Sequence, residues 1–123
     1  MNKRLIGKNG EDIAENLLTS QNYKIVSKNY SCRFGEIDIV AIDRQKEKYE
    51  LVFVEVKTRT SDMFGEPEEA MNFRKKNKIL KTIGHFFGNE KFNKRPLAWR
   101  IDLIAIKLEK EGEIKNINHY KNI

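Results

Sequence analysis

The sequence predicts an α/β sandwich in which helices cover a single mixed β-sheet. An amphipathic segment with helical spacing comes first, and three short segments rich in β-branched and aromatic residues follow it. A second, longer helical segment then separates the third strand from a fourth, and a helix in that place is typical of a crossover between parallel strands. The expected order is α-β-β-β-α-β with a weak fifth strand at the end. The 123 residues fit a single domain over 1–123.

The first half of the chain predicts one helix and three strands. Residues 9–20 are expected to be helical because their apolar side chains recur along one stripe. That stripe consists of Ile13, Ala14, Leu17 and Leu18. Strands are expected at 23–30, 36–43 and 50–57, since each segment is short and is bounded by polar or glycine-containing breaks. The polar run 44–48 between the second and third strands predicts a hairpin loop.

The second half predicts the crossover helix and the last strands. Residues 67–87 are expected to form the helix, and Pro67 suits its first turn. The predicted apolar stripe of this helix consists of Ala70, Phe73, Leu80, Ile83 and Phe87. Residues 97–106 are expected to form the fourth strand and residues 113–119 the weak fifth.

Several other polar residues are expected to have structural roles. Arg100 and Asp102 share one face of the fourth strand, where the simplest expectation is that they pair with each other. His85 and His119 are expected at the surface or in packing contacts, and Cys32 is expected as a small buried or loop thiol. These histidines and the cysteine do not have the spacing of a zinc site.

The balance of charge points to a polyanionic partner. Lys and Arg number 24 against 18 Asp and Glu, which gives a formal net charge of +6 at pH 7. A single cysteine fits a reducing, cytoplasmic setting. No segment approaches the roughly 18 uninterrupted apolar residues of a membrane span, and polar residues follow the charged start where a signal peptide requires apolar ones. The sequence therefore predicts a cytoplasmic protein without a membrane partner.

The predicted hairpin brings charged residues together on one face of the sheet. Centring its turn between Lys46 and Glu47 places Asp38 opposite Glu55, and directly opposed residues share a face. Because side chains alternate along a strand, this face is expected to carry Glu36, Asp38, Val40, Ile42, Leu51, Phe53, Glu55 and Lys57. The other face is expected to carry Ile37, Ile39, Val52, Val54 and Val56.

The charged end of this face suggests a metal site. Opposed carboxylates repel, and charges rarely stay on a covered face without a partner or a metal ion. A hard cation such as Mg²⁺ would relieve the repulsion between Asp38 and Glu55, and the carbonyl of Val56 could supply a third oxygen. Lys57 points to the same side, where its ammonium could orient or help deprotonate an attacking water. On the pattern alone, a solvated strand end with an ordinary Glu–Lys pair explains these residues equally well.

Further charged residues have both a functional and a structural interpretation. Glu11 borders the apolar stripe of the first helix and could reach the same end of the sheet, although an acid in a first turn is also favoured by the helix dipole. Glu36 is expected farther out, as a solvated carboxylate or as a group that supports the metal ligands without binding the metal. A basic run on the second helix suggests phosphate contacts, although such runs are usually solvated faces. It consists of Arg74, Lys75, Lys76, Lys78 and Lys81. Arg59, just beyond the charged strand end, could also clamp a phosphate.

At this point the residues resemble a known family. Asp38 in Gly35-Glu36-Ile37-Asp38-Ile39-Val40, followed by Glu55-Val56-Lys57, resembles the D…(E/D)-x-K core of the PD-(D/E)XK, or restriction-endonuclease-like, superfamily. Together with Gly7-x-x-Gly10-Glu11 and Asn29-Tyr30, these strings resemble the YraN-like family, which is regarded as similar to archaeal Holliday-junction resolvases. Ile37 stands where the superfamily name has proline, a position that varies within it.

The resemblance implies a fold, a site and a reaction. The fold is the restriction-endonuclease-like three-layer sandwich, with a mixed central sheet flanked by helices. The implied roles are metal ligation by Asp38 and Glu55, catalysis by Lys57, and an accessory carboxylate in Glu11. The expected activity is Mg²⁺- or Mn²⁺-dependent hydrolysis of phosphodiester bonds in structured or branched DNA. Cutting both strands of a junction would require a homodimer. The alternative is a noncatalytic module on the same fold that binds DNA or RNA.

Overall fold

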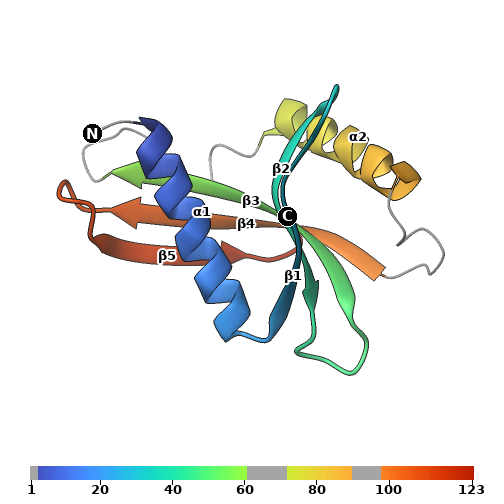
Figure 1. Cartoon of the computed structure of the whole chain (residues 1–123), viewed down its shortest axis with the longest axis horizontal. Coiled ribbons are helices and arrows are strands. Elements are labelled where there is room, and N and C mark those ends of the chain that lie inside the picture. The colour runs from blue at the N-terminus through green and yellow to red at the C-terminus, as the bar shows by residue number, and fades with distance from the viewer. Residues whose placement is uncertain (1–2, 61–71, 90–97) are drawn as a thin grey trace.

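The computed structural model describes residues 3–60, 72–89 and 98–123, and these residues form two helices and five strands (Figure 1). In chain order the elements are α1 (Lys3–Ser20), β1 (Tyr23–Cys32), β2 (Gly35–Asp43), β3 (Glu50–Thr60), α2 (Phe73–Asn89), β4 (Ala98–Leu108) and β5 (Ile114–Tyr120). The predicted order is confirmed, and the fifth strand is fully formed.

The five strands make one mixed sheet in the order β1-β2-β3-β4-β5. Strands β1, β2 and β3 pair antiparallel, β3 pairs parallel with β4, and β4 pairs antiparallel with β5. The parallel pair is the one whose connection contains α2, so the predicted crossover is confirmed.

The two helices cover opposite faces of this sheet and create the three layers. In Figure 1, α1 lies across the face toward the viewer, and α2 lies beside the β1–β2 hairpin. The core beneath α1 consists of Ala14, Leu18, Tyr23, Ile39, Ala41, Val52, Val54, Ile104, Ile106 and Leu108. The core beneath α2 consists of Ile37, Val40, Leu51, Phe53, Ile79, Ile83, Phe86 and Ile101. The α/β class predicted from the sequence is therefore confirmed as a three-layer sandwich.

The register between β2 and β3 is the predicted one, with Val40 opposite Phe53 and Ile39 opposite Val54. The predicted face of Ile37 was wrong, because Ile37 packs with Val40 beneath α2 instead of beside Ile39. The β2–β3 ladder ends at the Ile39–Val54 pair, while the pairing of β1 with β2 continues to Gly35. Beyond this point the β1–β2 hairpin extends alongside α2 (Figure 1), and strict alternation from the sheet no longer applies.

Both helices begin at residues other than those predicted. Helix α1 begins at Lys3 instead of residue 9 and contains Gly10. Helix α2 begins at Phe73 because the side chain of Asn72 caps it, accepting a hydrogen bond from the Lys75 N–H at 2.9 Å. Residues 67–71 of the predicted helix, with Pro67 and Ala70 in or next to its first turn, lie outside the described residues, as does residue 97 of the predicted fourth strand.

The predicted apolar stripe of α2 was partly wrong. Phe73 is 81% exposed and Leu80 is 41% exposed, whereas Ile83 is buried and Phe87 packs against the core. The buried residues of α2 are Ile79, Thr82, Ile83 and Phe86. Spacings of three and four residues place these four on one side of the helix, and Leu80 lies about 100° round from Ile79.

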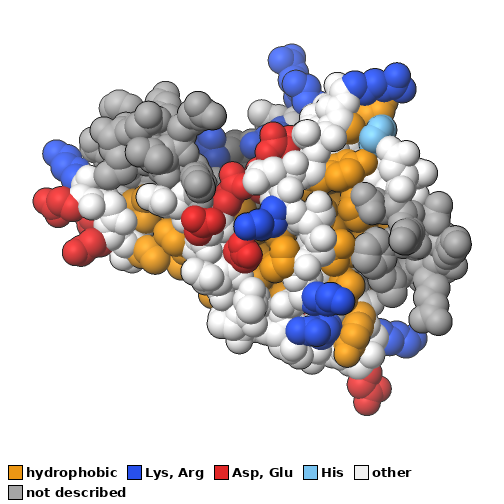
Figure 2. All heavy atoms as spheres, in the orientation of Figure 1, with side chains coloured by type: hydrophobic (Ala, Val, Ile, Leu, Met, Phe, Trp, Pro, Cys, Tyr) orange, Lys and Arg blue, Asp and Glu red, His pale blue; other side chains and the backbone are white. Residues whose placement is uncertain are grey.

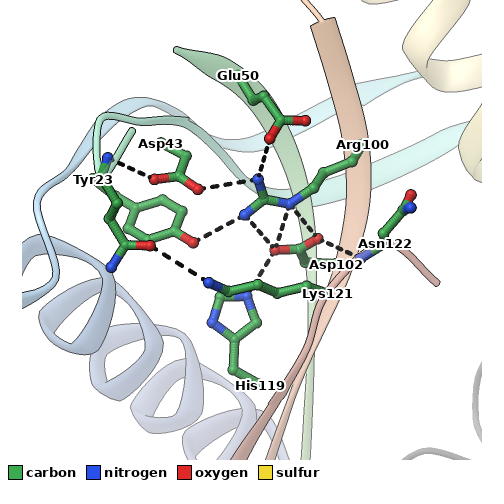
Figure 3. Close-up of polar contacts among 9 residues, drawn as sticks. Tyr23, Asp43, Glu50, Arg100, Asp102, His119, Lys121 and Asn122 are labelled. Carbon is green, nitrogen blue, oxygen red and sulfur yellow. Dashed lines mark hydrogen bonds and ion pairs between the residues drawn. The ribbon is translucent and has the colours of Figure 1, made fainter. Parts of the chain in front are cut away.

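A buried polar network ties all five strands together around the start of β4 (Figure 3). Its centre is Arg100 on β4, which is paired with Asp102 at 3.0 Å, as predicted. Arg100 also contacts three neighbouring strands, through Tyr23 of β1 (2.9 Å), Asp43 of β2 (3.0 Å) and Glu50 of β3 (3.0 Å). His119 of β5 contacts Asp102 at 2.7 Å. Because these carboxylates have close partners, the network is structural in character.

No helix in the described parts of the chain is long and apolar enough to cross a membrane.

Candidate active site where strands β2 and β3 part

The site begins at the point where β2 leaves β3. Just beyond the last paired residues, the carboxylate of Asp38 accepts a hydrogen bond from the backbone N–H of Val56, with an O–N distance of 2.8 Å. The side chain of Asp38 thus takes the place of a strand partner and satisfies a backbone donor on β3. This contact holds the Asp38 carboxylate next to Glu55, the neighbour of Val56.

Glu55 is a buried carboxylate with incomplete pairing. Its side chain is 8% exposed, and its Oε2 atom lies 3.7 Å from the ammonium of Lys75. Its Oε1 atom is buried and has no hydrogen-bond partner among the described residues. Burial, followed by the negative charge of Asp38, raises the pKa of Glu55 to about 8. A carboxylate in this setting is costly in its charged form unless another cation reaches it.

Asp38 is likewise in surroundings that disfavour its charged form. Burial raises the pKa of Asp38, the hydrogen bond from Val56 opposes that shift, and the charge of Glu36 adds to it. Two acids at one strand end that both resist ionisation are typical of functional sites, because a fold gains nothing by burying them.

Lys57 follows Glu55 by two residues on β3 and stands on the same side of the strand. Burial, with the nearby positive charges of Arg59 and Lys75, lowers the pKa of Lys57. The charges of Asp38 and Glu55 act in the opposite direction, which shows that the ammonium lies within their field. The structure thus brings together Asp38, Glu55 and Lys57, the three residues that the sequence singled out.

Glu11 reaches the same end of the sheet from α1. Burial and then the charge of Asp38 raise the pKa of Glu11, so this carboxylate also lies within the field of the site. The close approach of α1 depends on Gly10, where any Cβ would collide with the side chain of Thr58 on β3. Glycine at this position therefore lets α1 bring Glu11 close to the strand end.

Asn29, named above only as part of the Asn29-Tyr30 string and given no role at the site, links two of the carboxylates. With its amide nitrogen turned toward them, Asn29 donates to Oε1 of Glu11 at 2.7 Å and to Oε1 of Glu36 at 3.0 Å. Asn29 lies on β1 with a φ of 53°, in the left-handed region that asparagine tolerates better than most residues. Two signals in the sequence could have marked it: asparagine is rare inside strands, and Asn29 belongs to the Asn29-Tyr30 string of the family resemblance.

Two of the basic residues predicted to contact phosphate lie at this site. Lys75 and Lys78 line a pocket of about 150 Å³, whose other walls are Gly35, Glu36, Glu55, Ile79 and Thr82. Arg74 is exposed on the first turn of α2. Arg59 is half-buried, and its Nε atom has no hydrogen-bond partner within the described parts of the chain. Figure 2 shows Lys and Arg side chains at the end of the molecule where α2 and the tip of the β1–β2 hairpin lie.

The donor set fits a hard divalent cation, although the side chains alone do not enclose one. Among the described residues, no three Asp, Glu, His or Cys side chains converge in an arrangement that could hold a metal ion. The available ligands are the carboxylates of Asp38 and Glu55, with the Val56 carbonyl as a predicted third. Mg²⁺ and Mn²⁺ accept such a set, since water and substrate phosphate commonly complete their coordination. The unpaired Oε1 atom of Glu55 is the observation that supports the fit.

Comparison with known proteins identifies the family. The Uncharacterised protein family UPF0102 matches residues 10–106 of this chain. The chain belongs to the UPF0102 family. A UPF0102 protein of Caldanaerobacter subterraneus is 40% identical over 123 residues, covering 99% of this chain and 96% of the relative. UPF0102 proteins of Desulforamulus reducens and Clostridioides difficile are 37% and 38% identical, covering 98% and 99% of this chain and 95% and 98% of those relatives.

The family match confirms the resemblance to the YraN-like family that the sequence strings indicated. The matched UPF0102 segment contains every residue considered for the site, from Glu11 on α1 to Lys78 on α2. The family and the α/β fold are therefore established for this chain.

Proposed function

We propose that this UPF0102 protein is a Mg²⁺- or Mn²⁺-dependent endonuclease that hydrolyses phosphodiester bonds in structured or branched DNA. The observation that carries the proposal is the buried, unpaired carboxylate oxygen of Glu55, placed beside Asp38 and followed by Lys57. Buried acids that resist ionisation, next to a lysine whose pKa is lowered, provide the groups that metal-assisted hydrolysis requires.

Each residue of the site has a role in this reaction. Asp38 and Glu55 would hold the cation, with the Val56 carbonyl as a third ligand. The cation supplies Lewis-acid polarisation of the phosphodiester and lowers the pKa of a coordinated water. Lys57 orients the attacking water or stabilises the negative charge that develops on the phosphate. Glu11 acts as an accessory carboxylate from α1.

The basic surface around the site provides the contacts to the nucleic-acid backbone. Lys75 and Lys78 share a pocket with Glu55. Arg74 precedes Lys75 on the exposed first turn of α2, and Arg59 follows Lys57 by two residues on β3. A net charge of +6 favours association with a polyanion at this surface. The preference for branched DNA rests on the resemblance to Holliday-junction resolvases, and a cytoplasmic setting goes with it.

Symmetric cutting of a junction calls for two copies of the site. One chain carries one Asp38–Glu55–Lys57 group, and a four-way junction has two strands to cut at related positions. We therefore propose that the chain acts on such a substrate as a homodimer.

A noncatalytic DNA- or RNA-binding module is the second candidate, and one observation favours it. The described residues contain no cluster of three metal-ligating side chains. A protein that kept the fold and the basic surface but not cation binding would still bind nucleic acid. Its binding would be independent of Mg²⁺ and Mn²⁺.

The experiment that separates these candidates is a cleavage assay on labelled four-way junction, flap, duplex and single-stranded DNA, with structured RNA as competitor. Each substrate is tested in Mg²⁺, in Mn²⁺ and in EDTA, with Asp38→Ala and Lys57→Ala beside the wild type. Cation-dependent cutting of branched DNA that both substitutions abolish supports the endonuclease. Tight binding without a product in any cation supports the binding module.

A further inference from the structure

Lys75 connects the basic surface to the buried carboxylate. Its ammonium lies 3.7 Å from Oε2 of Glu55, yet the Lys75 side chain is 38% exposed, compared with 8% for Glu55. One end of this ion pair is therefore fixed in the protein interior, and the other reaches solvent. The same two side chains line the pocket that also contains Lys78.

The backbone of Lys75 is held in place by the helix cap, while its side chain is partly exposed to solvent. Asn72 caps the start of α2 by accepting a hydrogen bond from the Lys75 N–H at 2.9 Å. A further backbone hydrogen bond joins the Lys76 N–H to the Asn72 carbonyl at 2.9 Å. The long side chain of Lys75 can thus exchange one anion for another without any change in the helix.

The ammonium of Lys75 competes with any cation that Glu55 binds, because both are attracted to the same negative charge. At 3.7 Å the ammonium partly neutralises Glu55, so a divalent cation entering beside it meets like-charge repulsion. A phosphate in the pocket offers Lys75 a second anionic partner that is open to solvent. Movement of the ammonium toward that phosphate leaves Glu55 for the cation.

We propose that Lys75 is a counter-ion shared between Glu55 and a nucleic-acid phosphate, so that the binding of nucleic acid and the binding of a divalent cation strengthen each other. The proposal rests on the cation site of the proposed function and adds a coupling between the two ligands. By linkage, the factor by which DNA strengthens cation binding equals the factor by which the cation strengthens DNA binding. The protein would thereby hold its cation tightly when a substrate is present.

The test measures binding and not cleavage. The affinity for a fluorescent four-way junction is measured by anisotropy at constant ionic strength, in EDTA and in saturating Ca²⁺, and gels verify that the DNA stays intact. The affinity of the free protein for Ca²⁺ is measured by calorimetry. The variants are Lys75→Met, which removes the charge but keeps the length, and Lys78→Met, a matched control in the same pocket. Circular dichroism verifies that each variant is folded.

The wild type is expected to bind the junction about tenfold more tightly in Ca²⁺ than in EDTA, within the usual range of coupling between two sites. Lys75→Met is expected to bind Ca²⁺ more tightly than the wild type when DNA is absent, and to lose the tenfold coupling. Lys78→Met is expected to weaken DNA binding but to keep the coupling.

Two different failures are distinguishable. If Lys75→Met shows the same coupling as the wild type, the shared counter-ion is contradicted while the cation site stands. If the wild type binds no cation with or without DNA, both the cation site and the coupling are contradicted.

Discussion

Asp38 accepts a hydrogen bond from the backbone N–H of Val56, 2.8 Å away, at the point where β2 and β3 part. The contact fixes one carboxylate beside a second, that of Glu55, whose Oε1 atom is buried without a partner among the described residues. This arrangement opposes stability, since both acids have raised pKa values. A site that opposes the stability of its own fold is typical of function.

The buried acid should make the metal-free protein less stable as the pH rises. The pKa of Glu55 is raised from 4.5 to about 8, so the folded state binds this proton more tightly than the unfolded state does. The stabilisation is fully present below about pH 4.5 and is lost as the pH rises through 8. Glu55→Gln removes this dependence and should be more stable than the wild type at pH 8. Urea unfolding in EDTA between pH 5 and 9 measures both proteins, and identical profiles would contradict a buried, ionisable Glu55.

A divalent cation should reverse that loss of stability. Mn²⁺ binds the charged carboxylates of the folded state, so the Tm of the wild type at pH 8 is expected to rise with Mn²⁺ concentration. Asp38→Asn and Glu55→Gln should show no such rise, because each lacks one of the two carboxylates. Glu47→Gln is the matched control, since Glu47 is an exposed acid in the β2–β3 loop. An equal rise in all four proteins would indicate nonspecific binding.

Gly10 should be essential for the packing of α1 against β3. A Cβ at this position collides with the Thr58 side chain, so Gly10→Ala is expected to destabilise the protein by about 1–3 kcal/mol. Thr58→Ala removes the colliding atoms and should recover part of that loss in the double variant, as a double-mutant cycle would show. Gly84→Ala on α2 is the matched control, because its Cβ has open space and should stabilise the helix by up to about 1 kcal/mol. Additive effects of Gly10→Ala and Thr58→Ala would contradict the close contact.

The Arg100 network should be a major source of stability. Arg100→Met leaves the buried carboxylates of Asp43 and Asp102 without their cation, which is expected to cost about 3–5 kcal/mol. Burial raises the pKa values of both acids, but hydrogen bonds outweigh it, and both pKa values are lowered from 3.8. The largest lowering cause is the hydrogen bond from the Gln45 N–H for Asp43 and the one from His119 for Asp102. Their contribution is present above the unfolded pKa and is lost as the pH falls below it. Urea unfolding from pH 7 to pH 2.5 should show this acid loss in the wild type and a weaker one in the variant. A cost under about 1 kcal/mol would contradict the structural role.

The sequence predicted the sheet well because its signals there are local. The polar run 44–48 fixed the hairpin, and its centre placed Val40 opposite Phe53, as the structure confirms. From that register alone, Asp38, Glu55 and Lys57 could be placed together. The start of α2 was placed too early, because Pro67 also suits a first turn and the predicted apolar stripe begins at Ala70. The capping hydrogen bond of Asn72 sets the observed start at Phe73.

The rest of the site depends on contacts between distant segments. Ile37 lies on the face opposite to the predicted one because β2 leaves β3 and follows α2. The alternation of side chains along a strand does not predict such a departure. Asn29 reaches Glu11 and Glu36 from an edge strand, and Lys75 reaches Glu55 from a helix twenty residues away in sequence. Such contacts follow from tertiary packing, so the sequence could mark Lys75 as a charged residue and Asn29 as part of a family string, but it could not pair either with the carboxylates.

Hydrolysis by the Asp38–Glu55–Lys57 group is tested by comparing cutting with binding in one variant. Single-turnover cleavage of a labelled four-way junction is measured in Mn²⁺ for the wild type, Glu55→Gln and the control Glu47→Gln, and junction binding is measured for each in EDTA. Glu55→Gln is expected to bind the junction at least as tightly as the wild type does but to lose cleavage by at least about a hundredfold, while Glu47→Gln cuts normally. Cleavage by Glu55→Gln at the wild-type rate, or no cleavage by the wild type in any divalent cation, would contradict hydrolysis by this group.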